Sequence, residues 1–266
     1  MIKFIACDMD GTLLNSNKEF PERFEYVLEE LDKRGVKFAI SSGRQYYSLC
    51  EQLKNVRDKI YIIAENGAMV YDDKGSQIIC ESVDTKSCVD IIKLIKSDKD
   101  LYPVVCGVKS AYGEERNEPV LHEILPYYLA YETVDDLCKA AENDEVLKLA
   151  IYDNLGSEAH CYKLLSDYYD SHIVAVSGSN WLDVMKKGVT KGSAIDKLRE
   201  IYGWEKDECM AFGDFMNDYD MMLSCEESYA MENAHPDLKR ICKYIAPSND
   251  DDGVMKVICR EFGIEY

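Results

Sequence analysis

The sequence predicts an α/β protein in which a doubly wound, mostly parallel sheet is interrupted by an inserted α/β domain. Short apolar runs alternate with helical patterns over the first part of the chain, and the same alternation returns after Gly188. Strands that alternate with helices in this way form a parallel sheet with crossover helices. Between these two parts the order and spacing of the expected helices and strands change. We therefore expect residues 1–82 and 188–266 to form one domain and residues 83–187 to form the inserted one.

The first part of the chain is expected to fold as strand, helix, strand, helix and strand. Apolar residues from Phe24 to Leu31 recur at the spacing of one helix face, and Gly35 ends this helix. After the third strand, Asn66-Gly67 is a turn sequence that predicts two hairpin-like strands. The expected strands are 2–7, 36–40, 60–64, 68–71 and 77–80, and the expected helices are 22–34 and 45–53.

The middle segment holds many of the 19 tyrosines and is expected to form a separate α/β layer. Its expected helices are 86–96, 119–128 and 158–169, and its expected strands are 102–108, 147–152, 173–176 and 181–185. After Gly188 the apolar spacing from Ala194 to Ile201 predicts another helix. The elements expected there are helices at 193–202, 217–223 and 253–261, a short helix after Pro236, and strands at 209–212, 228–231 and 244–246.

The composition is that of an ordinary globular protein, and it narrows the classes of function. The 266 residues are 47% hydrophobic and 30% charged, with 15 glycines and 6 prolines, which argues against collagen-like and disordered chains. The 31 basic and 50 acidic residues give a net charge of −19, so a nucleic-acid groove or a polybasic membrane patch is not expected. Neither a signal-peptide core nor an uninterrupted run of about 18 apolar residues is present.

The cysteines and histidines predict neither a disulfide framework nor a zinc site. Eleven cysteines are an odd number without a C-x-x-C pair, and the four histidines show no H-x-x-x-H spacing. This pattern is typical of reduced, mostly buried thiols, so we expect a cytoplasmic protein. We expect it to be a monomer or homodimer.

The strongest local feature is Asp8-Met9-Asp10-Gly11-Thr12, which stands where a buried strand ends. Sites in open α/β sheets form at the carboxyl ends of the strands, so both acids should face one crevice. Two carboxylates at this spacing can hold a hard cation, or one can attack while the other handles a proton. A turn with an Asx hydrogen bond is the plain alternative. An EF-hand loop is excluded because Leu13 stands where that loop needs glycine.

Three other strand ends carry groups that suit the same crevice. Ser41-Ser42-Gly43-Arg44 opens a helix, so its hydroxyls and backbone N–H groups could receive a phosphate, although an N-cap is the simpler interpretation. Thr190-Lys191-Gly192-Ser193 also opens a helix, where a lysine is unfavourable unless an anion offsets it. Gly213-Asp214-Phe215-Met216-Asn217-Asp218 adds acids that could equally cap a helix. The coincidence of all four favours a site over four separate caps.

Together these four motifs resemble those of the haloacid dehalogenase superfamily, and more narrowly its Cof-type sugar-phosphate phosphatases, along the whole chain. The resemblance implies a Rossmann-like core with an inserted α/β cap that sets substrate specificity and closes over small substrates. Ser41-Ser42 and Thr190 depart mildly from the family pattern, in which Ala-Thr and Ser are common, but Ser42 keeps the hydroxyl. The motifs are 8–14, 41–44, 188–192 and 213–218, with Glu65-Asn66-Gly67-Ala68 as a further match.

The resemblance also implies a role for each motif residue. Asp8 would attack phosphorus and become an aspartyl phosphate, and Asp10 would protonate the leaving alcohol and then activate water. Ser42 and Lys191 would hold the phosphoryl oxygens. Mg²⁺ would bind Asp8, the backbone carbonyl of Asp10 and Asp214, with Asp218 behind its waters. Further substrate contacts are expected from Gly43, Arg44 and Asn217.

The expected partner is therefore a small phosphorylated metabolite. Hexose phosphates, pyridoxal phosphate and flavin mononucleotide all remain open within the family, because the cap sequence does not identify the substrate. Two other functions remain as alternatives: a phosphomutase, which shares the aspartate pair, and a catalytically silent sugar-phosphate sensor. Only about 30 residues (13–41) separate the first two motifs, which leaves no room for the small helical insert of a mutase. A sensor would be expected to have lost a catalytic acid, whereas this chain keeps all of them.

Overall fold

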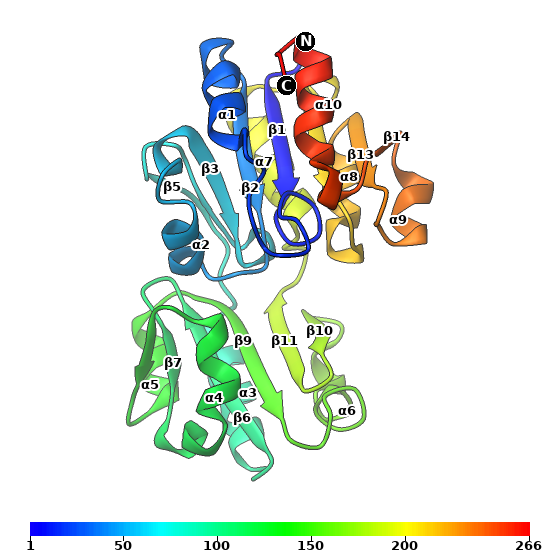
Figure 1. Ribbon diagram of the computed structural model, residues 1–266. Coiled ribbons are helices and arrows are strands. Elements are labelled where there is room, and N and C mark those ends of the chain that lie inside the picture. The colour runs from blue at the N-terminus through cyan, green and yellow to red at the C-terminus, as the bar shows by residue number, and fades with distance from the viewer. The chain divides into compact units, whose positions relative to one another are not determined.

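The computed structural model describes residues 1–266, and the chain forms two compact units. Unit 1 comprises Met1–Gly43, Gln52–Ile79 and Thr190–Tyr266, and unit 2 comprises Arg44–Glu51 and Cys80–Val189. Each unit is built on its own sheet (Figure 1). The predicted class, a mostly parallel α/β core with a further α/β part, is confirmed, whereas the domain boundaries at 82/83 and 187/188 stay predictions.

The sheet of unit 1 has eight strands, and its central strand, β1 (Phe4–Asp8), is buried along its whole length. β1 pairs in parallel with β2 (Lys37–Ser41) and with β12 (Cys209–Gly213). Strands buried on both faces are typical of parallel sheets, which explains the unbroken apolar run before Asp8. The sheet continues in parallel through β3 (Ile60–Ala64) on one side and β13 (Glu227–Met231) and β14 (Tyr244–Ala246) on the other, and ends beyond β3 with antiparallel β4 (Met69–Tyr71) and then β5 (Gln77–Cys80).

Helices cover both faces of this sheet (Figure 1). α1 (Phe24–Lys33) and α10 (Gly253–Phe262) contact each other on one face, and α7 (Lys191–Tyr202) and α8 (Tyr219–Ser224) contact each other on the other. α7 begins with a capping box, in which the side chains of Thr190 and Ser193 each accept a bond from the other's backbone N–H. This cap fixes the point at which Lys191 enters the helix. The remaining helix of unit 1 is α9 (Pro236–Ile241).

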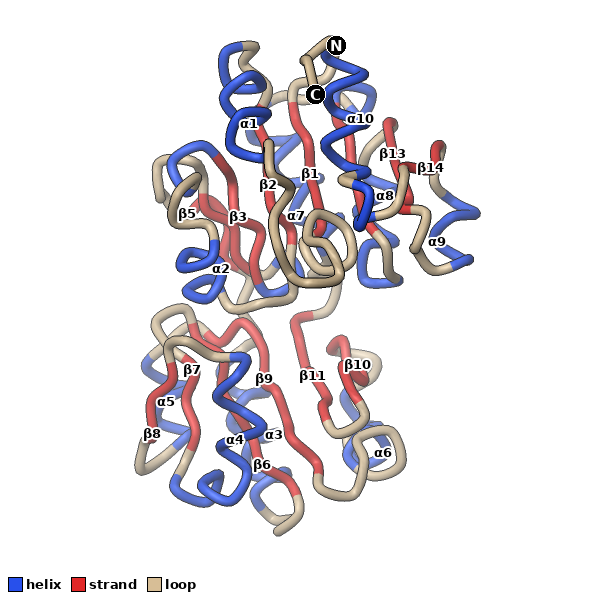
Figure 2. The backbone as a smooth tube through the Cα atoms, viewed as in Figure 1, coloured by secondary structure: helices blue, strands red, loops and turns tan.

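The sheet of unit 2 has six strands and is mostly antiparallel. Figure 2 shows its strands in red. Its core alternates along β9 (Val146–Asp153): Leu149 and Ile151 belong to one apolar cluster, whereas Ala150 between them belongs to another on the opposite face. α3 (Thr85–Lys96), α5 (Leu137–Asn143) and α6 (Cys161–Leu164) contribute to the first cluster, and α4 (Leu121–Ile124) to the second. In sheet order the strands are β10 (His172–Gly178), β11 (Trp181–Lys186), β9, β6 (Leu101–Gly107), β7 (Ala111–Gly113) and β8 (Tyr131–Thr133). α2 (Tyr46–Gln52) begins in this unit.

Most differences from the expected elements lie in unit 2. The expected helix at 119–128 is a chain of short pieces, in which α4 is flanked by the 3₁₀ segments Glu115–Val120 and Leu125–Tyr127. Pro126 stands inside the expected helix, where it lacks the N–H that would bond to the carbonyl of His122 and its ring clashes with that carbonyl, so the regular α-helix is interrupted there. The expected helix at 158–169 is likewise α6 followed by the 3₁₀ segment Ser166–Tyr168. Strands β7 and β8 and helix α5 were not expected. No helix of either unit combines the length and apolar character that crossing a membrane requires.

Candidate active site

Three neighbouring parallel strands of unit 1 end together and bring the first acids of the site into one place. Asp8 is the last residue of β1 and lies beside Ser41, the last residue of β2. On the other side of β1, strand β12 ends at Gly213, directly before Asp214. The carboxyl ends of parallel strands share one edge of the sheet, and ligand sites in open α/β folds form there.

Lys191 joins this edge from the first turn of α7. Its Nζ lies 2.6 Å from Oδ1 of Asp8 and 2.6 Å from Oδ1 of Asp218. The side chains of Lys191 and Asp218 are fully buried, and that of Asp8 is 9% exposed. A buried ammonium is tolerated only when it is paired and hydrogen-bonded, and here two carboxylates provide that pairing.

Asp218 also holds the loop that carries Asp214. The backbone N–H groups of Asp214 and Phe215 donate to Oδ2 of Asp218, at 3.0 and 3.2 Å. Both carboxylate oxygens of Asp218 are thus engaged, one with Lys191 and one with the loop. The residue therefore fixes the position of its neighbours.

The chain after β1 approaches Asp214 closely. The hydroxyl of Thr12 donates to Oδ1 of Asp214 at 3.2 Å. Gly11 has a φ of +80°, and a Cβ at this position would lie 2.4 Å from Oδ2 of Asp214. Only glycine combines this left-handed backbone with the absence of a side chain. The segment Asp10-Gly11-Thr12 thus helps to hold Asp214 in place.

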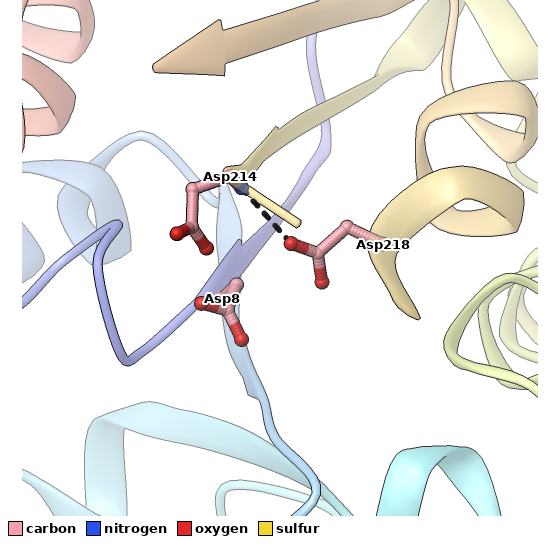
Figure 3. A group of neighbouring side chains, drawn as sticks. All are labelled: Asp8, Asp214 and Asp218. Atoms are coloured by element: carbon pink, nitrogen blue, oxygen red, sulfur yellow. Dashed lines mark hydrogen bonds between the residues drawn. The ribbon is translucent and has the colours of Figure 1, made fainter. Parts of the chain in front are cut away.

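One oxygen from each of Asp8, Asp214 and Asp218 can be chosen so that all three lie within 4.8 Å of one another. Figure 3 shows the three side chains gathered at the end of β1, with Asp218 bonded to the backbone of Asp214. Carboxylate oxygens are the ligands that Mg²⁺ prefers, so this donor set fits a hard divalent cation. Asp8 and Asp214 are the best candidates for direct metal ligands. Both oxygens of Asp218 are already hydrogen-bonded, one to Lys191 and the other to backbone N–H groups.

The electrostatics of the cluster show a surplus of negative charge. Burial raises the pKa of Asp8, and although the charge of Lys191 acts against this, that of Asp218 adds to it. Burial also raises the pKa of Asp214 to about 6, with the charge of Asp218 as the next cause. For Lys191, burial lowers the pKa but the charges of Asp218 and Asp8 outweigh it, so its pKa is raised. One ammonium among three carboxylates leaves room for a further cation, which would restore their ionised forms.

Asp10 is more exposed than these buried acids, and its charge is one of the causes that raise the pKa of Asp214. Its side chain is 36% exposed, and its Oδ1 accepts a hydrogen bond of 2.9 Å from Nζ of Lys18. The first motif therefore carries one buried carboxylate and one at the surface, which suits two different tasks.

The second motif is fixed by the turn after β3. The N–H of Ser42 donates to the carbonyl of Ile63 at 2.8 Å, and the carbonyl of Ser42 accepts from the N–H of Asn66 at 3.0 Å. A Cβ on Gly43 would lie 3.1 Å from the amide of Asn66, so glycine allows this side chain to approach. Nδ2 of Asn217 donates to Oδ1 of the same Asn66 at 3.5 Å. Ser42, Gly43 and Asn217 thus gather around Asn66.

Arg44 belongs to unit 2, and its role as a substrate contact stays a prediction. Ser42 is buried, with 3% exposure. The neighbouring hydroxyl of Ser41 is buried without a hydrogen-bond partner.

Several residues of the site were not predicted as functional. Asn66 and Thr12 lie inside motifs that the sequence displays, so their contacts could have been suspected. Lys18 and Asn233 carry no such signal: Lys18 reaches Asp10, and Nδ2 of Asn233 donates to the carbonyl of Gly11 at 2.7 Å. Both stand in polar loops, where sequence alone does not distinguish a contact from a solvated side chain.

A family model for haloacid dehalogenase-like hydrolases matches residues 5–258. The chain belongs to this family. The resemblance that the four motifs predicted is thereby confirmed, and the site described above lies within the matched region.

Several relatives of the chain are named phosphatases. The chain is 29% identical over 262 residues to 5-amino-6-(5-phospho-D-ribitylamino)uracil phosphatase YbjI of Escherichia coli (strain K12), covering 97% of this chain and 95% of that protein. It is 25% identical over 251 residues to the HMP-PP phosphatase of Cronobacter sakazakii, covering 90% and 87%. The crystal structure of TM0651 from Thermotoga maritima superposes with a TM-score of 0.89 at 29% identity, covering 98% and 97%. The enzyme class is thus that of a phosphatase of the haloacid dehalogenase type.

Proposed function

We propose that this protein is a Mg²⁺-dependent phosphomonoester hydrolase that acts on small phosphorylated metabolites through an aspartyl phosphate on Asp8. The observation that carries the proposal is the Asp8–Lys191–Asp218 contact, in which the side-chain carboxylate of Asp8 is held by a buried ammonium beside further acids. This arrangement places a nucleophile next to a cationic group that can bind phosphoryl oxygens.

In the first step, a carboxylate oxygen of Asp8 forms a bond to phosphorus while the bond from phosphorus to the leaving oxygen breaks. A proton from the carboxyl group of Asp10 passes to that leaving oxygen, which departs as an alcohol. In the second step, the carboxylate of Asp10 takes a proton from water as the water oxygen attacks phosphorus. The bond from phosphorus to Asp8 then breaks, so inorganic phosphate leaves and both acids return to their starting forms.

Lys191 has the position required to stabilise the transferred group. Its Nζ already contacts Asp8, so an oxygen of a phosphoryl group on Asp8 would lie next to the ammonium. Developing negative charge on that oxygen would be stabilised in a buried, low-dielectric setting. The hydroxyl and backbone N–H groups around Ser42, and the amide of Asn217, are proposed to hold the remaining oxygens.

The metal is proposed to bind Asp8 and Asp214, with the carbonyl of Asp10 as a further ligand and Asp218 behind its waters. When bound, Mg²⁺ supplies positive charge that offsets the acids and polarises a phosphoryl oxygen. Burial, with the charge of Asp218 adding to it, raises the pKa values of Asp8 and Asp214, so a bound cation would stabilise their ionised forms.

The substrate class is proposed from the site and from the relatives. A site built on one lysine, hydroxyls and backbone donors suits a single phosphoryl group, and the related YbjI is named for a phosphorylated ribityl compound. We propose sugar phosphates and similar metabolites as substrates, with no nucleic acid or membrane as partner. All eleven cysteines are free thiols, which supports a cytoplasmic location.

The test is phosphate release from p-nitrophenyl phosphate and from a panel of sugar phosphates, with and without Mg²⁺. We expect turnover that EDTA abolishes and Mg²⁺ restores, and that disappears in Asp8→Asn. Absence of turnover by the folded wild-type protein on every ester of the panel, with Mg²⁺ present, would falsify the proposal.

A further inference from the structure

Lys18 forms an ion pair with Asp10, the residue that makes both proton transfers in the proposed mechanism. Nζ of Lys18 lies 2.9 Å from Oδ1 of Asp10. The Lys18 side chain is 62% exposed, so the pair stands at the surface. Exposed ion pairs contribute little to stability. The contact is therefore weak as a stabilising interaction, and its place next to Asp10 points to an effect on the orientation of that carboxyl group.

The backbone at Lys18 is held in a conformation that lysine rarely adopts. Its φ is +65°, in the left-handed region. Asn15 imposes this turn: its carbonyl accepts from the N–H of Lys18 at 2.9 Å, and its side-chain oxygen accepts from the N–H groups of Asn17 and Glu19 at 2.9 and 3.0 Å. Such a conformation persists only where neighbouring contacts determine it. The backbone therefore fixes the direction in which the Lys18 side chain leaves the loop.

The loop itself is fastened to the other end of the chain within unit 1. The N–H and hydroxyl of Ser16 donate to the two oxygens of Asp250, at 2.7 and 2.8 Å. Nδ2 of the buried Asn249 donates to the carbonyl of Leu14 at 2.9 Å. These contacts lie on both sides of residue 15, so the turn that carries Lys18 cannot shift without breaking them.

We propose that Lys18 is a positioning residue for the proton transfer by Asp10. The anchored turn holds the ammonium at a fixed point, and the ammonium holds the carboxyl group of Asp10 in one orientation toward the leaving oxygen. The inference rests on the proposed phosphatase mechanism. It adds that the exposed acid, unlike the buried Asp8, is oriented by a side chain contributed by the loop 9–19.

The test varies the leaving group while the transferred phosphoryl group stays the same. p-Nitrophenolate is stable as an anion and departs with little proton donation, whereas a sugar alkoxide requires it. We measure kcat/KM, which reports the steps up to the aspartyl phosphate, for p-nitrophenyl phosphate, phenyl phosphate and the best sugar phosphate. For Lys18→Met we expect a loss of about tenfold on the sugar phosphate, below the 10²–10⁴-fold of complete general acid catalysis, and a smaller loss on each better leaving group.

Three further variants separate positioning from other effects. Lys18→Arg should recover most of the lost kcat/KM, because it keeps the positive charge. Lys33→Met, which removes an ion pair with Glu30 of similar exposure on α1, should leave all three substrates unchanged. Adding Lys18→Met to Asp10→Asn should have no further effect, since the group that Lys18 orients is already lost.

Equal losses on all three substrates, or additive losses in the double variant, would overturn the proposal, because Lys18 would then act on binding or folding. Unchanged kcat/KM in Lys18→Met would also overturn it. Absence of any turnover by the wild-type protein is a different result, since it removes the phosphatase mechanism itself.

Discussion

Both units of the molecule bury carboxylates, but the two sets are satisfied differently. In unit 2, Asp153 is fully buried. Its carboxylate accepts hydrogen bonds from the N–H groups of Leu155 and Cys161, at 2.8 and 2.9 Å, and is also hydrogen-bonded to the ring of His160. In unit 1, Asp8 and Asp218 share the ammonium of Lys191, and Asp214 accepts a hydrogen bond from the hydroxyl of Thr12. Asp218 also accepts two backbone N–H groups, so the three acids together have one buried countercharge. A carboxylate surrounded by backbone donors stabilises a turn, whereas acids in excess of their countercharge indicate a site that binds something further.

The largest expected effect comes from removing the buried ammonium of Lys191, which pairs with Asp8 and Asp218 in unit 1. Lys191→Met should lower kcat by about 10²–10³-fold, the range measured for loss of a single group that stabilises charge in the transition state. It should also lower the melting temperature, because Asp8 and Asp218 lose their buried partner. Steady-state kinetics and thermal unfolding measure the two effects. Near-normal kcat in a folded variant would break the comparison, since Lys191 would then be only a structural partner of the acids.

The surplus of acids predicts that Mg²⁺ stabilises unit 1 even without substrate. A ligand at 100 times its dissociation constant adds about 2.7 kcal/mol to the free energy of unfolding, so the melting temperature should rise on addition of Mg²⁺. Asp214→Asn should remove most of this rise. Asp153→Asn is the matched control from unit 2 and should keep it. A rise of equal size in wild type and Asp214→Asn would place the cation elsewhere.

The satisfied carboxylate of unit 2 should matter for stability alone. Asp153→Asn exchanges a charged acceptor for a neutral one among two backbone donors and a histidine, and should cost about 1–3 kcal/mol of unfolding free energy. Activity per folded molecule should change by less than about twofold, because no reacting atom is involved. Urea unfolding and phosphate release measure the two quantities. A loss of turnover without a loss of stability would contradict the structural role given to Asp153.

The smallest effect is a pH dependence in unit 2. Ring nitrogens of His160 lie 3.1 Å from oxygens of Asp153 and Asp98. The hydrogen bond with Asp153 raises the pKa of His160, burial acts against this, and the charges of Asp153 and Asp98 add to it. A group whose pKa is raised on folding stabilises the protein fully below its unfolded pKa of about 6.5, and this contribution is lost as the pH rises through the folded value.

The stability difference between wild type and His160→Asn should therefore be larger at low pH than at high pH. Its change should stay below about 1 kcal/mol, because the histidine is partly exposed. Chemical unfolding of both proteins across this range measures it. A constant difference would show that His160 contributes only through packing.

The two units also differ in how far the sequence predicts them. In unit 1, the strands β3 and β14 have the predicted bounds, and α7 and α10 begin or end within a few residues of them. Long apolar runs and helix faces with a 3.6-residue period produce these signals. In unit 2, β7 and β8 have three residues each, which is too short for any period to appear. Its α4 region is interrupted at Pro126, where the chain continues as a short 3₁₀ segment.

Within the site, the sequence predicts which residues stand at strand ends but not how they meet. Asp8 and Lys191 are 183 residues apart, and only the packing of α7 against the sheet brings them to 2.6 Å. Asn66 has a φ of +53° in a turn between Ala64 and Gly67, and no propensity predicts that its amide will face Gly43 and Asn217. Contacts made by exposed loops, such as that of Lys18, are the least predictable.

The most direct measurement for the whole account is detection of a phosphoryl group on Asp8. Asp10→Asn should form the aspartyl phosphate from p-nitrophenyl phosphate and Mg²⁺ but hydrolyse it slowly, because the base for the second step is missing. Rapid quenching, borohydride reduction and peptide mass spectrometry should then find homoserine at position 8. Steady p-nitrophenol release by this variant with an unmodified Asp8 would contradict the account, because water would then attack the substrate directly.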